Sequence, residues 1–149
     1  MSLHIRLAAV ADLDTLVPLF DGYRQFYRQA SNPDRARSFL AERLSKNESQ
    51  ILLAVDPSGM GLGFTQLYPL FSSVRAVRTY LLNDLFVVGS ARRQGVARAL
   101  LIAAADHARG LGAASLSLST ALDNLPAQAL YESVGWQRDQ GFCEYGLVL

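Results

Sequence analysis

The sequence predicts an α/β protein built on a mixed sheet, and three observations carry that prediction. The chain has 149 residues, half of them hydrophobic, which suits one domain with a single substantial core. Its first half contains strand and turn patterns typical of an antiparallel meander. Its second half has a strand–helix–strand order, which joins parallel strands through a crossover. We therefore expect residues 1–149 to form one mixed-sheet domain.

The N-terminal third is expected to contain one strand and two helices. Apolar and polar residues alternate over residues 3–7, as in a short strand. Asp12 is placed to cap a helix whose apolar stripe ends at Tyr23 or Tyr27. Asn32 and Pro33 suit the N-cap and first position of a second helix, which continues to about residue 45. The expected buried residues of this helix are Ala36, Phe39, Leu40 and Leu44.

The middle of the chain is expected to form the three-strand meander. Residues 56–59 (DPSG) have the composition of a tight turn, and residues 72–78 form a polar loop. The expected strands span residues 50–55, 61–70 and 79–88.

The last third is expected to alternate helices and strands. A helix from about residue 94 to 109 ends at Gly110 or Gly112, because glycine readily supplies the left-handed C-cap. A second helix ends at Gly135. The remaining expected elements are strands over residues 114–120 and 142–149 and that second helix, from about residue 125 to 134.

The junction between the third meander strand and the next helix has the pattern of a pyrophosphate-binding loop. The first turn of a helix offers backbone N–H groups without intrahelical partners and a partial positive charge. Gly95 and Ala97 leave room for a phosphate to approach these groups. Formal positive charge is added by Arg92, Arg93 and Arg98.

Composition excludes several classes of site. With 14 basic and 13 acidic residues the net charge is +1, which gives no electrostatic case for nucleic acid or a membrane surface as partner. The single Cys143 precludes an internal disulfide and is expected to be a small buried strand residue. His4 and His107 lie far apart in the sequence, so no metal site is expected. Lacking an apolar stretch at its N-terminus, the chain is interpreted as cytoplasmic.

Two motifs resemble signatures of the GNAT superfamily of N-acetyltransferases. Residues 92–97 (RRQGVA) match Arg/Gln-x-x-Gly-x-Gly/Ala, and residues 124–136 (NLPAQALYESVGW) resemble Asn-x-x-Ala-x-x-Leu-Tyr-x-x-x-Gly-Phe. The motifs stand in the family's order, with a helix and a strand between them. The resemblance implies a mostly antiparallel central sheet with helices on both faces, acetyl-CoA held between two splayed parallel strands, and a homodimer.

The same resemblance assigns roles to individual residues. Main-chain groups of Leu85, Phe86 and Val87 would contact the pantetheine arm, which Asn124 would also hydrogen-bond. Tyr131 would stand near the sulfur as the acid for the departing thiolate. Alternatively, Asn124 is only a helix N-cap and Tyr131 only a half-buried packing residue. The implied pyrophosphate loop consists of Arg92, Arg93, Gln94, Gly95, Val96, Ala97 and Arg98.

A narrower likeness is to diamine and yeast histone/polyamine acetyltransferases, and it implies a small amine such as a polyamine as acceptor. It rests on residues 63–64 and 82–87 and on the aromatic residues Tyr23, Phe26 and Tyr27, which helical spacing alone would assign to the core. The alternatives are a protein or peptide lysine or N-terminal acetyltransferase, and a regulatory domain that binds acyl-CoA without turnover.

The general base is where the sequence departs from these relatives. A primary ammonium has a pKa of roughly 10.4, so it must lose a proton before it attacks the thioester. Diamine acetyltransferases carry Glu-Asp where this chain has Asn83-Asp84. The base is therefore either Asp84 or a water chain held by Asn83, Tyr80 and Ser119. Strand alternation would put Asn83 and Asp84 on opposite faces unless a β-bulge intervenes. Because the family splays its strands at this level, the resemblance implies such a bulge near here.

Overall fold

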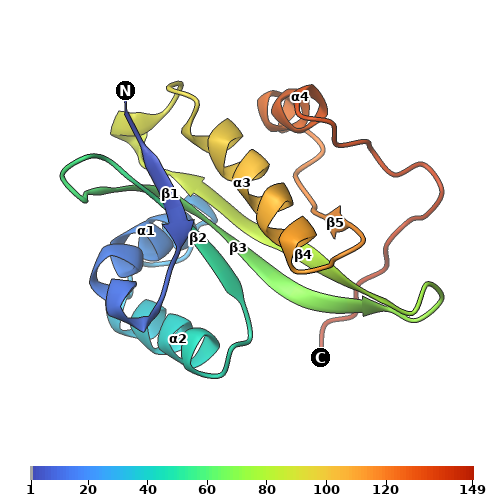
Figure 1. The fold of residues 1–149 in the computed structure, drawn as a ribbon, viewed down its shortest axis with the longest axis horizontal. Coiled ribbons are helices and arrows are strands. Elements are labelled where there is room, and N and C mark those ends of the chain that lie inside the picture. Colours follow the sequence, from blue (N-terminus) through green and yellow to red (C-terminus); the bar gives the residue numbers. More distant parts are fainter. Residues whose placement is uncertain (1) are drawn as a thin grey trace. The chain divides into compact units, whose positions relative to one another are not determined.

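The structure, a computed structural model, describes residues 2–149 as two compact units (Figure 1). The first unit runs to Ser119, and the second spans Thr120–Leu149.

The first unit is built on a five-stranded mixed sheet in the order β1-β2-β3-β4-β5. The first three pairings are antiparallel, and β4 pairs with β5 in parallel. The mixed sheet predicted from the sequence is confirmed. Its strands are β1 (His4–Leu7), β2 (Gln50–Val55), β3 (Gly61–Ser72), β4 (Val77–Val87) and β5 (Leu116–Ser117).

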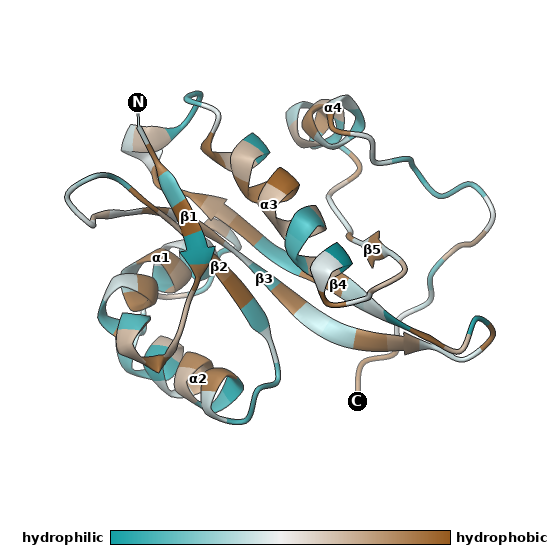
Figure 2. Ribbon diagram, in the orientation of Figure 1, coloured by the Kyte–Doolittle hydropathy of each residue, from teal (hydrophilic) through white to brown (hydrophobic). Residues whose placement is uncertain are grey.

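Helices cover both faces of this sheet. Successive side chains of a strand point to opposite faces, and apolar side chains lie on both of them, so both faces are buried under helices. The helices are α1 (Leu13–Phe26), α2 (Pro33–Ser45) and α3 (Val96–Gly110), with short 3₁₀ turns at Val10–Asp12 and Gly89–Ala91. β2 is hydrophobic along most of its length (Figure 2). The core under α1 and α2 includes Leu16, Phe20, Leu40, Ile51, Leu53 and Phe64. Leu52, Ala54 and Leu67 alternate with these residues and lie on the α3 face, with Leu100, Leu101 and Ala104.

The helix ends confirm most of the expected capping residues. The Asn32 side chain accepts a hydrogen bond from the Arg35 N–H at 3.1 Å, and Pro33 is the first residue of α2. Gly112 follows α3 with φ of +80°, the left-handed conformation expected there. Asp12 is different, because its carboxylate does not cap α1. It is held instead by both terminal nitrogens of Arg6, at 2.7 and 2.9 Å.

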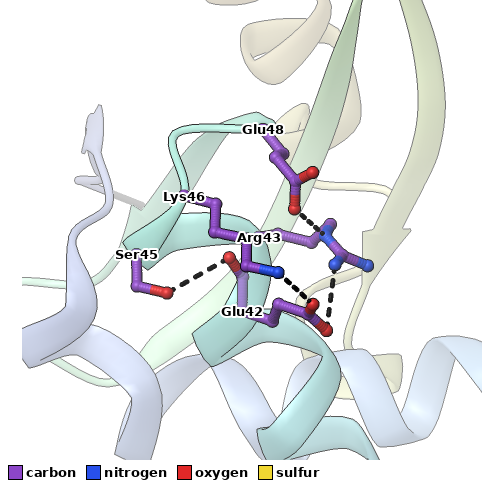
Figure 3. A network of polar contacts seen from close by, with 5 residues as sticks. All are labelled: Glu42, Arg43, Ser45, Lys46 and Glu48. Atoms are coloured by element: carbon purple, nitrogen blue, oxygen red, sulfur yellow. Dashed lines mark hydrogen bonds and ion pairs between the residues drawn. The ribbon is translucent and has the colours of Figure 1, made fainter.

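The C-terminal end of α2 is joined to the segment that follows it by a network of ion pairs (Figure 3). Arg43 lies between two carboxylates, with Nη2 3.1 Å from Glu42 and Nε 3.0 Å from Glu48. Lys46 adds a second cation on Glu42 at 2.7 Å. Exposed pairs of this kind stabilise weakly, so the network chiefly fixes where the chain leaves the helix.

The contact between β3 and β4 depends on the absence of a side chain at Gly63. A Cβ atom built there would lie 2.6 Å from the carbonyl oxygen of Phe86, which is a backbone atom of the paired strand. We expect Gly63→Ala to lower the free energy of unfolding by about 1–3 kcal/mol, because the strands must separate locally. Denaturant unfolding measures this change. Gly110→Ala is the control, since a Cβ there meets nothing within 4 Å, and an equal loss in both variants would contradict the steric explanation.

The second unit contains one helix, α4 (Leu125–Ser133), close to the expected range. The prediction of a strand over residues 142–149 is wrong, because these residues have no regular secondary structure. A strand requires hydrogen bonds to a neighbouring strand, which an apolar pattern cannot guarantee. Cys143 is accordingly exposed and not a buried strand residue. No helix within residues 2–149 is both long and apolar enough to cross a membrane.

Candidate active site

A β-bulge in β4 brings two polar side chains to one face of the sheet. Gln66 pairs with Asp84 and Leu67 pairs with Leu82, so Asn83 is the extra residue on β4. Because a bulge interrupts the alternation of side chains, Asn83 and Asp84 both lie on the face of the sheet that α1 covers. The bulge expected from the sequence is confirmed.

Asp84 is buried among neutral hydrogen-bond donors. Asp84 is only 2% exposed. Oδ2 accepts a hydrogen bond from Gln66 Nε2 at 2.5 Å, and Oδ1 accepts one from Asn83 Nδ2 at 2.8 Å. The Tyr23 hydroxyl, from α1, donates to the Asn83 carbonyl oxygen at 3.1 Å and also acts on the Asp84 carboxyl.

Burial raises the pKa of Asp84 above its ordinary value of 3.8, although the donors from Asn83, Gln66 and Tyr23 oppose this shift. Burial also raises the pKa of Tyr23 and of Tyr68, and the Asp84 charge adds to both shifts. Both phenols therefore stay protonated. A carboxyl group whose pKa is raised by burial is typical of catalytic acids and bases.

The two parallel strands separate next to this bulge. β4 and β5 pair only through Tyr80 with Leu116 and Leu81 with Ser117, whereas β4 continues to Val87. Since the Val88 N–H binds the Leu62 carbonyl on the β3 side, alternation turns the main-chain groups of Val87 and Leu85 toward the unpaired edge. The main chain of Phe86 faces β3 instead.

The water chain expected between Asn83, Tyr80 and Ser119 is not assembled on one face. Tyr80 precedes the bulge and lies on the face opposite Asn83, where its hydroxyl accepts a hydrogen bond from Arg78 Nη1 at 3.3 Å. Ser119 is exposed and follows the end of β5. The hydrogen-bond partner of the Asn83 side chain is therefore Asp84, not Tyr80.

The loop before α3 has the backbone of an anion-binding turn. Arg93 and Gly95 have φ of +62° and +81°, so the left-handed conformation recurs within three residues. Gly95 is the N-cap, and α3 begins at Val96, two residues later than expected. The space around Gly95 is open, because a Cβ there would meet no atom within 4 Å.

The arginines of this loop are not equivalent. Arg92 Nε donates to the Val87 carbonyl oxygen at 3.1 Å, and its guanidinium lies 5.9 Å from the centre of the Phe86 ring. This contact links the loop to the end of β4. Arg98 belongs to the first turn of α3, together with Val96 and Ala97.

The aromatic residues at the end of α1 divide into two kinds. Tyr23 packs against Phe64 and Phe86, with ring centres 5.9 and 6.5 Å away. Phe26 and Tyr27 are 60% and 58% exposed, so the core position expected from helical spacing is wrong for them. Their rings contact each other at 5.3 Å, and Tyr27 contacts Tyr23 at 5.1 Å.

The remaining candidates belong to the second unit. Asn124 is the N-cap of α4, where its Oδ1 accepts a hydrogen bond from the Ala127 N–H at 3.3 Å. Tyr131 lies on α4, and its ring centre is 6.3 Å from that of Trp136. The N-cap interpretation of Asn124 is confirmed, and it leaves the side-chain amide group available for a second interaction.

Gln66 is a site residue that the sequence analysis missed. It lies within an apolar strand, and the expected alternation gives no sign that its side chain meets Asp84. The pairing depends on the bulge, which sets the register of β3 against β4.

Comparisons with known proteins point to one family. A model described as the acetyltransferase (GNAT) family matches residues 16–136. The uncharacterized N-acetyltransferase YhfO of Bacillus subtilis (strain 168) is 49% identical over 145 residues, 97% of this chain and 97% of that protein. A crystal structure of a probable acetyltransferase has a TM-score of 0.94 at 45% identity, covering 98% of this chain and 97% of that one. Aminoglycoside N(6')-acetyltransferase type 1 of Klebsiella aerogenes is 35% identical over 105 residues, 67% of this chain and 69% of that protein.

Proposed function

Since the chain belongs to the acetyltransferase (GNAT) family, we propose that it transfers the acetyl group of acetyl-CoA to a small primary amine by direct attack. The family resemblance of the two sequence motifs is confirmed by these matches. The observation that carries the proposal is the bulge in β4, which presents a buried carboxylate where β4 and β5 separate.

Acetyl-CoA fits the residues around the unpaired edge of β4. The edge offers the main-chain groups of Leu85 and Val87 to an extended amide chain, much as a neighbouring strand would. The loop before α3 offers open space at Gly95 and the first-turn amides of the helix to a pyrophosphate. Asn124 in the second unit is proposed as a further pantetheine contact.

Acetyl-CoA binding is expected to depend on the amides of residues 94–97 more than on any single arginine. Gly95→Val places branched carbons where the pyrophosphate would approach, so coenzyme A affinity should fall by about tenfold or more, each tenfold being about 1.4 kcal/mol. Calorimetry measures the affinity. Gly112→Val is a matched control, since Gly112 has the same positive φ and the same open surroundings at the other end of α3. Unchanged affinity in a folded Gly95→Val variant would contradict the proposed loop.

The acceptor amine requires a base, and we assign this role to Asp84. Because the carboxyl is buried and hydrogen-bonded on both oxygens, a water at the exposed Asn83 side chain would relay the proton. The nitrogen lone pair then attacks the thioester carbonyl. An N–H on the edge near Val87 stabilises the oxyanion. As the C–S bond breaks, the thiolate takes a proton from Tyr131, the residue that the family resemblance assigns as the acid, and the proton that the nitrogen loses on forming the amide restores the phenol.

The acceptor class is proposed from the surroundings of Asp84. The exposed rings of Phe26 and Tyr27 suit an ammonium group with apolar carbon attached, and Tyr23, which Tyr27 contacts, links them to Asp84. One relative is named for acetylation of aminoglycosides, which are also amines. We therefore propose a small amine, with polyamines as one class to be tested.

A thiol-release assay tests the function directly. Acetyl-CoA is offered with polyamines, aminoglycosides, amino acids and lysine peptides in parallel. Turnover of a small amine supports the proposal, and turnover of the peptides alone would favour a protein acetyltransferase. Coenzyme A binding without release on any acceptor would favour the binding-only alternative.

A further inference from the structure

The side chain of Gln66 is buried completely but only half satisfied. The residue is 0% exposed, and Nε2 donates to Asp84 Oδ2 at 2.5 Å. Its other polar atom, Oε1, is buried and has no hydrogen-bond partner among the described residues. A buried acceptor without a partner is costly, so its presence calls for an explanation.

The amide group of glutamine offers a donor on one side and an acceptor on the other. Ionised Asp84 needs a donor, and Nε2 supplies it in the structure. Protonated Asp84 carries an O–H and needs an acceptor. Rotation of the amide by about half a turn around the Cγ–Cδ bond brings Oε1 to that place, because the two ends of the group have nearly the same shape.

We propose that Gln66 is the positioning residue for Asp84, and that its amide hydrogen-bonds the carboxylate through Nε2 and the carboxylic acid through Oε1. This rests on the proposed function, in which Asp84 gains a proton from the amine in each turnover. The unpartnered Oε1 is then the acceptor held ready for the protonated state. Gln66 touches Asp84 and not the reacting atoms.

Among the other groups around Asp84, Asn83 also carries an amide, but it is exposed, so water competes with its acceptor for the protonated carboxyl. Asn83 on β4 and Tyr23 on α1 act on the carboxyl as donors. Tyr68 on β3 is kept protonated by burial. Arg43 on α2 opposes the rise in the pKa of Tyr68, and it forms ion pairs with Glu42 and Glu48. Gln66 is therefore the wholly buried amide that meets the Asp84 carboxyl in both of its protonation states.

Gln66→Met tests the proposal, because methionine has a similar length and lacks both the donor and the acceptor at the amide. Both protonation states of Asp84 lose a hydrogen bond in this variant, but the bond to the ionised carboxylate is the stronger one. The pH at which Asp84 titrates should therefore rise by about half a pH unit to one unit. Carbon NMR of the Asp84 carboxyl reports this titration without any acceptor present. The acidic limb of the pH–rate profile should move by the same amount. Gln29→Met, at an exposed position, is the control and should change neither.

The wild-type chain provides a second measurement if Gln66→Met fails to fold. The side-chain nitrogen signal of Gln66 should shift as Asp84 titrates, and this pH dependence should vanish in Asp84→Asn. A carboxyl titration unaffected by Gln66→Met, or a Gln66 signal that ignores Asp84, would overturn the proposal. If both NMR results hold but no acceptor is acetylated, the proposed function fails and the role of Gln66 stands.

Discussion

Asp84→Asn is expected to lower kcat by about 10²–10⁴-fold and to flatten the acidic limb of the pH–rate profile. The amide cannot accept a proton from the amine, whereas the ionised carboxylate can, and general base catalysis typically contributes that factor. The measurement is thiol release under saturating acetyl-CoA, over a pH range that spans the acidic limb.

The variant should fold, which makes the kinetic result interpretable. Asn83 Nδ2 would still donate to the remaining carbonyl oxygen at position 84. The new NH₂ group would face Gln66, whose unpartnered Oε1 would accept from it after rotation of the amide. A raised KM with little change in kcat would show that Asp84 only attracts the cationic amine.

Asp21→Asn is the matched control for this variant. Asp21 is also buried, but it accepts hydrogen bonds from the Ser31 hydroxyl and the Asn32 N–H, and these contacts lower its pKa. Its variant should lose stability and keep its turnover. If Asp84→Asn likewise loses stability and keeps its turnover, Asp84 is a structural carboxylate and takes no part in the reaction.

The pH dependence of stability separates the two aspartates as well. The pKa of Asp84 is raised on folding, so its contribution to stability is fully present below 3.8 and is lost as pH rises through the folded pKa. The melting temperature of Asp84→Asn, relative to that of the wild type, should therefore increase as pH rises through that range. For Asp21 the sign is opposite, because its pKa is lowered and its contribution is lost as pH falls.

The parts of the fold that the sequence predicted correctly are those with local causes. Asn32 and Pro33 begin α2 because the cap and the ring geometry act within one turn. The same holds for the left-handed Gly112 after α3. Asp12 failed as a cap because Arg6, on another element, competes for its carboxylate.

The candidate site was less predictable because it depends on register. The bulge could be anticipated at residues 83–84, but the partner of Asp84 is decided by how β3 pairs with β4. Phe26 and Tyr27 keep the helical spacing of core residues and yet are exposed, at the last residue and the C-cap of α1. Hydrophobic periodicity indicates which face of a helix is apolar, but it gives no information on how far along the helix that face is buried.

Tyr131→Phe is expected to lower kcat by about 10²–10⁴-fold while coenzyme A affinity stays nearly unchanged. The change removes one hydroxyl and keeps the ring, so it removes a proton donor and leaves the apolar surface in place. The contact between this ring and Trp136 should persist, which argues for a folded variant. Single-turnover thiol release measures the chemical step, and calorimetry measures the affinity.

Tyr145→Phe controls for the loss of a phenol in the same unit, since Tyr145 is almost fully exposed. It should leave both quantities unchanged. A Tyr131→Phe variant with near-normal turnover across pH would show that water protonates the thiolate, and the tyrosine would then be a packing residue of α4. A donor at Tyr131 must carry its proton, so the wild type should lose turnover at high pH, where a phenol ionises. Tyr131→Phe should lack this basic limb, which a packing defect would not remove.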